Sequence, residues 1–370
     1  MNNIIISPCH YQGYKYDIYD DTLVIYKPID NIVDIYKIEN NKWIKKNEFI
    51  TNVYNDPLFD TYLTKESLKQ KNLIYCITIN SKYIYISFIY FIQVYELINN
   101  EYIHIKTIDN IDISVKNNEI INDNEIMFIK NDYTYINNNN ILIYGNYNYY
   151  LTILPDYTTI FTKNKGIKHF LSELVVGIDD NNLLYTINED YIIYIKKLNN
   201  ENNMWITYKE INFLNQLSIK EKEYLDIIPR DIPYHNYSIT KNGKYVSILF
   251  TSRIKNEEIT DYDDFYYYIN ILIYEKNNEE EYNIVFNYKI PGHTYRDGIT
   301  INNNILTFYR YDTRTIYFFM KINDKWLLTN KIDNIRYYID YFDQLKSNDK
   351  SINMITVCQD NEIKLLYTII

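Results

Sequence analysis

The amino-acid sequence predicts an all-β fold, a β-propeller of about seven four-stranded blades, with six or eight blades as alternatives. Three observations favour this fold: the residue types, a hairpin pattern that recurs along the chain, and the strands expected at its two ends. Ile, Tyr, Val, Thr and Phe abound in the 370 residues, and Ala is absent. Because Ala is the best helix former, whereas β-branched and aromatic residues fit a half-buried sheet, strands are favoured over helices.

A hairpin pattern recurs at residues 33–50, 92–108, 192–211, 269–290 and 317–332. Each segment has a β-rich run, a turn of Asn, Asp or Glu, an aromatic residue and a second run. Asn and Asp tolerate left-handed backbone angles, so these turns predict β-hairpins. All three tryptophans of the chain occupy this aromatic position after the turn. These five residues, which we call the marker aromatics, are Trp43, Tyr102, Trp205, Tyr282 and Trp326.

A second pattern, an apolar run, a short polar turn and another strand, precedes several hairpins at residues 73–88, 237–250 and 298–308. Together the two patterns give a four-stranded antiparallel unit. The marker aromatics lie 59, 103, 77 and 44 residues apart, and the longest gap accommodates a degenerate unit around residues 137–154. A four-stranded unit of about 40–50 residues has the period of a propeller blade.

The two ends of the chain fit a closed ring. The N-terminus begins with NIIIS, a lone strand, and residues 351–370 supply two or three strands and then stop. Because a ring closed by the N-terminal strand leaves fewer exposed sheet edges, we expect residues 1–370 to form a single propeller domain closed in this way. Helix signals at 56–71 and 211–233 predict insertions between blades, which carry function or cover a blade edge.

One stretch carries a family resemblance. Gly292-His293 is the only Gly-His pair in the chain, and it is followed by YDTRTIYFF, which contains Asp312 and Thr315-Ile316. The run SITKNGKYVSILF places a Lys-Asn-Gly-Lys turn between two strands. These features resemble a WD-repeat propeller unit, where a Gly-His pair precedes the innermost strand and an Asp lies in the turn before the third strand. The resemblance implies that His293 hydrogen-bonds Asp312 and pins the two turns together.

The sequence predicts no catalytic, cofactor-binding or metal-binding residue. His293 as a catalytic base is the alternative to its structural role, but no recognisable nucleophile motif accompanies it, and a buried His is usually satisfied by local hydrogen bonds. The acidic loops 256–265 and 277–282 lack the Gly that calcium loops often contain, so we expect them to be solvated. Phosphate loops, dinucleotide fingerprints and nucleophile elbows do not occur in the sequence.

Two predicted loops combine Tyr with charged or ionisable residues, PYHNY and HTYRD. Because Tyr and Arg are enriched in binding hot spots, Tyr234, His235, Tyr295 and Arg296 are candidate partner-binding residues. His293, Asp312, Trp43, Trp205 and Trp326 are assigned structural roles. With a net charge of −10 and mixed Lys and Glu, the chain is a poor candidate for nucleic-acid binding.

These observations predict a non-enzymatic scaffold that binds a protein partner. The first alternative is a hydrolase or lectin that acts on carbohydrate through the central channel, and the second is a virion structural component. The lack of Ala and the 7 Gly and 7 Pro indicate an A+T-rich genome, such as that of a giant DNA virus. We expect a cytoplasmic or virion location, because the N-terminus has no signal-peptide pattern and no apolar run approaches the roughly 20 residues of a membrane span.

Overall fold

The computed structural model describes most of the chain as strands and tight turns. The described residues are 2–7, 15–27, 30–51, 74–88, 91–109, 133–139, 141–145, 149–157, 159–163, 174–188, 192–199, 201, 204–212, 237–255, 265–292, 297–333, 345–347, 351–357 and 363–369. Within them there are strands and no helix, as the residue types predicted. The strands group into seven four-stranded antiparallel sheets, numbered here I to VII in chain order.

The strands of each sheet follow one another along the chain. Sheet I consists of β2 (Lys15–Tyr19), β3 (Thr22–Lys27), β4 (Ile32–Glu39) and β5 (Lys42–Ile50), and sheet II of β6 (Ile74–Ile79), β7 (Tyr83–Phe88), β8 (Phe91–Ile98) and β9 (Glu101–Asp109). Sheet III consists of β10 (Tyr133–Ile136), β11 (Leu142–Gly145), β12 (Tyr149–Ile153) and β13 (Thr159–Lys163), and sheet IV of β14 (Leu174–Ile178), β15 (Leu183–Ile187), β16 (Ile192–Asn199) and β17 (Met204–Asn212).

The remaining sheets complete the series. Sheet V consists of β18 (Tyr237–Ile239), β19 (Tyr245–Lys255), β20 (Phe265–Lys276) and β21 (Tyr282–Pro291), and sheet VI of β22 (Gly298–Ile301), β23 (Ile305–Arg310), β24 (Thr315–Ile322) and β25 (Lys325–Ile332). Sheet VII combines β26 (Leu345–Ser347), β27 (Ser351–Val357) and β28 (Ile363–Ile369) with β1 (Asn2–Ser7).

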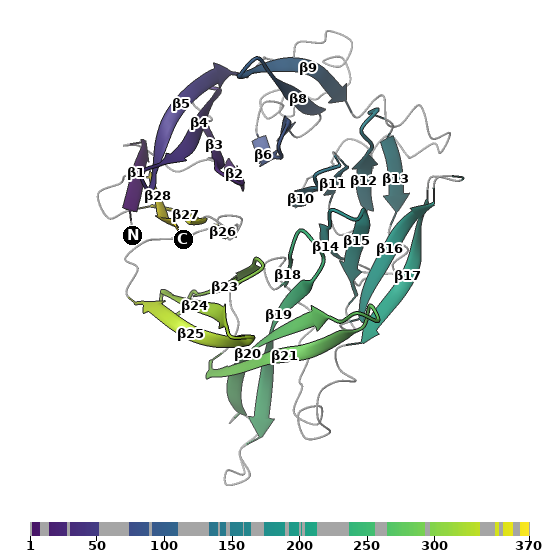
Figure 1. The fold of residues 1–370 in the computed structure, drawn as a ribbon, viewed down its shortest axis with the longest axis vertical. Helices are drawn as coiled ribbons and strands as arrows, with labels where there is room; N and C mark the ends of the chain where they lie inside the picture. The colour runs from purple at the N-terminus through teal and green to yellow at the C-terminus, as the bar shows by residue number, and fades with distance from the viewer. Residues whose placement is uncertain are drawn as a thin grey trace.

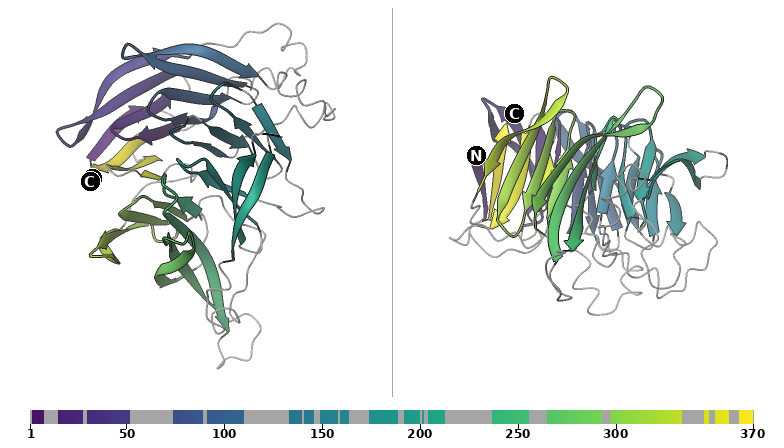
Figure 2. Two further views of the ribbon diagram at one scale, coloured as in Figure 1. Left: turned by 45° about the vertical axis from the view of Figure 1, so that its right-hand side comes forward. Right: turned by 90° about the horizontal axis from the view of Figure 1, so that it is seen from below.

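The sheets form a propeller-like arrangement around a central axis (Figure 1). The first strand of each sheet lies innermost, and these strands contact their neighbours in the order β2, β6, β10, β14, β18, β22, β26 and back to β2. Seen from the side, the sheets stand face to face like slanted blades (Figure 2). Each sheet is therefore covered on its faces by the sheets next to it in the ring.

Sheet VII joins the two ends of the chain. Strand β1 pairs antiparallel with β28, with Asn2 opposite Tyr367 and Ile5 opposite Lys364, and so becomes the outermost strand. The backbone groups of β28 that would otherwise form an open edge are thus paired, as the lone N-terminal strand predicted.

The fourth strand of five sheets carries the same β-bulge. In sheet I, Ile35 pairs with Asn47 and Tyr36 pairs with Lys45, so Lys46 is the extra residue. The corresponding residues in sheets II, IV, V and VI are Ile105, Tyr208, Val285 and Thr329. Each lies three positions after its marker aromatic. Because a bulge increases the local twist, the same bend recurs at the rim of each of these sheets.

The marker aromatics pack between sheets. Trp326 meets Tyr245 of sheet V edge-on, with ring centroids 5.7 Å apart. Tyr282 hydrogen-bonds Tyr185 of sheet IV, with 3.2 Å between their hydroxyl oxygens. Further partners in the preceding sheet are Thr152 for Trp205 and Phe49 for Tyr102. In four sheets the residue after the hairpin turn therefore anchors its sheet to the one before it.

Two segments predicted as insertions lie largely beyond the described residues. Residues 56–71 and 213–233 fall outside them. Residues 211 and 212 end β17, where Ile211 pairs with Ile193 and is buried.

A double-mutant cycle tests the anchoring role of Trp205, whose Nε1–H donates to the buried Thr152 hydroxyl over 2.8 Å. We expect Trp205→Phe to lower the free energy of unfolding by about 1–3 kcal/mol, because a buried polar group loses its partner. Adding Thr152→Val should cost less than the two single effects summed, because both polar groups are then gone. Urea denaturation measures this, and strict additivity would contradict it.

Candidate functional site in the central channel

The innermost strands enclose a cavity at the centre of the ring. Its volume is about 370 Å³, and its wall comes from β2, β6, β10, β14, β18 and β22 and the turns that follow them. The strands contribute both aliphatic and polar side chains to the wall, and the turns supply polar and charged side chains at its mouth. The channel is therefore of mixed polarity, with charges at its rim.

A repeated local motif builds that rim. In five sheets the residue after the innermost strand is a buried polar residue, namely Asn80, Asn137, Asp179, Thr240 or Asn302. Its side-chain oxygen accepts hydrogen bonds from backbone N–H groups at the start of the next strand, as Asn137 does from Asn139 and Ile141. Short polar side chains form such turns because they can satisfy nearby backbone donors.

The same turns are hydrogen-bonded to one another around the channel. Asn80 Nδ2 donates to the carbonyl oxygen of Asn137 over 3.2 Å, and Asn137 Nδ2 donates to that of Asp179 over 3.0 Å. The backbone N–H of Asp180 donates to the carbonyl oxygen of Lys241 over 2.7 Å. Asn242 Nδ2 then reaches Asn303 Oδ1 over 3.0 Å. These contacts join sheets II to VI in ring order, and we call them the turn belt.

Gly243 allows the belt to close between sheets IV and V. Its φ is +66°, and a Cβ there would collide with the Asp179 carboxylate and the Tyr185 hydroxyl. The Tyr282 hydroxyl donates to the Gly243 carbonyl oxygen over 2.5 Å. Only Gly has both the backbone freedom and the missing side chain that this approach requires.

Burial raises the pKa of Asp179 above its ordinary value, although hydrogen bonds to its carboxylate oppose that rise.

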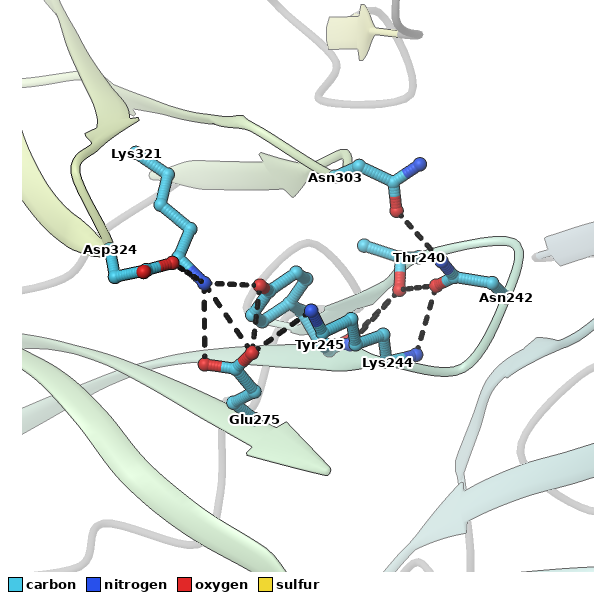
Figure 3. Close-up of polar contacts among 8 residues, drawn as sticks. All are labelled: Thr240, Asn242, Lys244, Tyr245, Glu275, Asn303, Lys321 and Asp324. Atoms are coloured by element: carbon cyan, nitrogen blue, oxygen red, sulfur yellow. Dashed lines mark hydrogen bonds and ion pairs between the residues drawn. The ribbon is translucent and has the colours of Figure 1, made fainter. Parts of the chain in front are cut away.

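Sheets V and VI meet at a second polar cluster beside the belt (Figure 3). Lys321 Nζ donates to the Tyr245 hydroxyl over 2.7 Å, and that hydroxyl donates to Glu275 Oε1 over 3.0 Å. Lys244 forms an ion pair with Glu275 at 3.1 Å, and Lys321 reaches Asp324 at 3.4 Å. Because every charge in the cluster faces an opposite charge or a hydroxyl, its geometry fits a fastener between the sheets.

The mouth of the channel holds a contact between two sheets that are not neighbours. Lys241 of sheet V places its ammonium nitrogen 4.0 Å from the centroid of the Tyr19 ring of sheet I. Burial raises the pKa of Tyr19, and the negative charges of Asp180 and Asp20 add to that rise, while a hydrogen bond with Ser81 lowers it. The ring of Tyr19 therefore lies among carboxylates and beneath a cation.

Deeper in the channel, Asp17 is held by the neighbouring sheet. Its Oδ2 accepts a hydrogen bond from the Thr78 hydroxyl at 2.8 Å and another from the backbone N–H of Ile79 at 3.0 Å. The side chain is buried, yet it contributes to the channel wall. A carboxylate fixed in this way supplies negative charge at a set depth below the mouth.

The region of the WD-repeat resemblance is partly described. His293 lies outside the described residues, whereas Asp312 accepts two hydrogen bonds from the Arg310 guanidinium at 2.6 and 2.7 Å. A side chain at Gly292 would collide with that guanidinium, so Arg310 lies between Gly292 and Asp312. Asp297, just before β22, joins the same turn by accepting from the backbone N–H of Tyr311 at 2.7 Å. Sequence reasoning did not identify Asp297.

The four candidate partner-binding residues, Tyr234, His235, Tyr295 and Arg296, all lie outside the described residues. The channel residues Asp17, Tyr19 and Lys241 were not predicted. The recurring polar residue after each innermost strand was a usable signal for the turn belt. Nothing in the sequence indicated that Tyr19 and Lys241 would meet, because they are far apart in the chain and in different sheets.

The described residues include no helix long and apolar enough to cross a bilayer. They also include no group of three His, Cys, Asp or Glu side chains placed to hold a metal ion. Cys76, the cysteine they contain, forms no disulfide with another described residue and is partly exposed.

Comparison with known proteins gives the fold. No protein-family model matches the chain, and no curated protein matches it by sequence. A protein of unknown function from Desulfotomaculum acetoxidans is similar over 95% of this chain and 94% of its own, with 9% identity and a TM-score of 0.54. An inactive variant of virginiamycin B lyase from Staphylococcus aureus, solved with quinupristin, covers 100% and 99%, with 11% identity and a TM-score of 0.50. At such identities the likeness is one of propeller fold alone.

Asp297 makes stability depend on pH. Burial raises its pKa from 3.8 to about 7, and among the described residues its Oδ2 has no hydrogen-bond partner. Between those two values the native protein holds a proton that the unfolded chain has lost. The free energy of unfolding should therefore fall as pH rises through this window and level off above pH 7.

We expect Asp297→Asn to keep the acceptor for Tyr311 and to remove this loss. The variant should be more stable than the native protein above pH 7 by about 1–3 kcal/mol and lack the slope between about pH 4 and 7. Urea denaturation across that range measures the effect. If the free energy of unfolding depended on pH equally in both proteins, ionisation of the Asp297 carboxyl would not destabilise the native protein.

Proposed function

We propose that the protein is a scaffold that binds a protein partner on its outer rim. The observation that supports this proposal is the position of the exposed large apolar side chains. Among the described residues, all of them lie on the outer hairpins, the third and fourth strands of sheets I, II, IV, V and VI. Single exposed apolar residues are common on protein surfaces. The confinement of the exposed apolar side chains to the outer hairpins, however, indicates a surface that a partner can cover.

The outermost strand of sheet IV shows this best. Met204 is 60% exposed, Ile206 48% and Tyr208 45%, whereas Trp205 between them is buried against the preceding sheet. Strand β17 thus turns Trp205 inward and Met204, Ile206 and Tyr208 outward, and we call this outward row the β17 stripe. An edge strand with an exposed apolar row invites a partner, because its backbone and its side chains can both be covered.

The rim also contains features that limit nonspecific pairing. Lys209 Nζ donates to the carbonyl oxygen of Glu280 over 2.5 Å, and the Tyr208 hydroxyl donates to the Glu280 carboxylate. Lys197 lies over the Tyr208 ring with its nitrogen 3.7 Å from the centroid. Charges around an apolar row protect an edge from self-association and give a polar margin to an apolar contact.

The finer parts of the proposal rest on the sequence together with the strand pairing. They are a closed ring of seven blades, a relationship to WD-repeat propellers, an origin in an A+T-rich genome such as that of a giant DNA virus, and a cytoplasmic location. A carbohydrate hydrolase or lectin is the second candidate, because the channel mouth combines Tyr19 with Asp20 and amide side chains. A virion structural protein would instead use the whole rim for lateral contacts.

Charge substitution on the β17 stripe tests the scaffold proposal. We expect Met204→Lys together with Ile206→Lys to reduce capture of a specific partner from native-cell extract by about tenfold or more, because two central apolar contacts are lost. Quantitative mass spectrometry of affinity-purified protein measures the enrichment. The matched control is Asn283→Lys with Thr329→Lys, which adds the same charge at exposed polar positions of other outer strands.

The outcomes separate clearly. A partner retained by the native protein and the control, but lost from the stripe variant, supports docking on β17. Equal enrichment in all three proteins, or no enriched partner, would overturn the proposal. Thermal unfolding of each variant shows whether the fold is kept.

A further inference from the structure

The contact between Lys241 and Tyr19 closes the channel mouth from within. Sheets I and V are separated by other sheets on both sides of the ring, so the lysine side chain must span the mouth to reach the ring. Its backbone is fixed in the turn belt, because its carbonyl oxygen accepts from Asp180 N–H. The side chain itself is exposed. The part of this contact that lies outside the turn belt is therefore the alkylammonium chain of Lys241.

The surroundings of the Tyr19 ring favour a cation. An ammonium group over an aromatic face is attracted to the negative centre of the ring. Asp20 and Asp180 lie close enough for their charges to act on the Tyr19 hydroxyl. A ring, two carboxylates and an opening to solvent together form a recognition site for an ammonium group, and Lys241 occupies it.

The channel below the mouth fits the rest of an alkyl chain. Its wall includes Ile18, Ile79, Ile136, Val176, Ile178 and Ile239. The wall also includes Asp17, which lies on β2, whereas Asp20 lies in the turn that follows this strand. Carboxylates thus lie at two positions of a wall that also has aliphatic side chains, and the cavity of about 370 Å³ has room for a short linear chain.

We propose that the central channel binds a linear aliphatic diamine. One ammonium group takes the place of Lys241 over Tyr19, between Asp20 and Asp180. The methylene chain lies along the aliphatic wall, and the second ammonium group approaches Asp17. Lys241 acts as an intramolecular competitor that must leave the ring before the ligand enters. This inference goes beyond the proposed scaffold function, because it concerns the channel and a small cationic ligand.

Substitution of Lys241, the intramolecular competitor, tests the proposal most directly. Lys241→Met keeps an unbranched side chain and removes the ammonium group. Because a cation–π contact contributes about 0.5–1 kcal/mol, we expect diaminohexane to bind this variant about two- to fivefold more tightly than the native protein. Isothermal titration calorimetry of the full chain measures the affinity. Lys82→Met is the matched control, since Lys82 lies in the corresponding turn of sheet II and pairs with Glu96 outside the cavity, and it should leave the affinity unchanged.

Further arms test the carboxylates and the ligand chemistry. Asp20 has φ of +51°, which Asn also tolerates, so Asp20→Asn removes the charge without straining the turn and should weaken binding by about threefold or more. Hexylamine should bind more weakly than diaminohexane, because it lacks the group that approaches Asp17. Hexanediol, of similar shape and no charge, should not bind.

Several results would overturn the proposal. They are weaker or unchanged binding in Lys241→Met, no heat of binding in either protein, equal affinities for hexylamine and diaminohexane, or binding of hexanediol. Thermal unfolding of each variant shows that a lost affinity is not a lost fold. Because none of these variants touches the β17 stripe, the result is independent of partner docking.

Discussion

Each sheet of this protein can bury its two faces only against the sheets beside it, and the rest of the structure follows from that constraint. The marker aromatics meet it at the rim, where Trp326 packs on Tyr245 and Trp205 donates to Thr152. Buried aromatic rings supply large apolar area, and the polar atoms of Trp205 and Tyr282 find partners across the interface. The recurring bulge after each marker bends the outer strand in the same way, so one solution to sheet packing is repeated around the ring.

Near the axis, hydrogen bonds between turns hold neighbouring sheets together. Where the innermost strands converge, the turn belt links the sheets through side-chain amide and backbone groups. Asn137 accepts from its own turn and donates to the next, so a single side chain stabilises both local and long-range structure. The fold therefore has aromatic contacts between sheets at the rim and hydrogen-bonded turns near the axis.

The two proposed surfaces lie on different parts of this architecture. The rim exposes the apolar row of β17, which the packing of Trp205 forces outward because neighbouring residues of a strand face opposite sides. The channel mouth contains charges that belong to turns and not to strands, so it can vary without altering the packing between sheets. Both surfaces belong to a ring in which β1 pairs with β28.

The sequence by itself determined the all-β class, the hairpins, the marker aromatics and the closing N-terminal strand. These follow from local rules: residue type sets strand propensity, Asn and Asp set the turns, and the spacing of Trp43 and its equivalents reveals the repeat. Only the tertiary structure decided that Lys241 meets Tyr19, that Asp17 is held by Thr78, and that Asp297 joins the Tyr311 turn. Such contacts join residues far apart in the chain, and their geometry depends on how the sheets are placed around the axis, which no local pattern encodes.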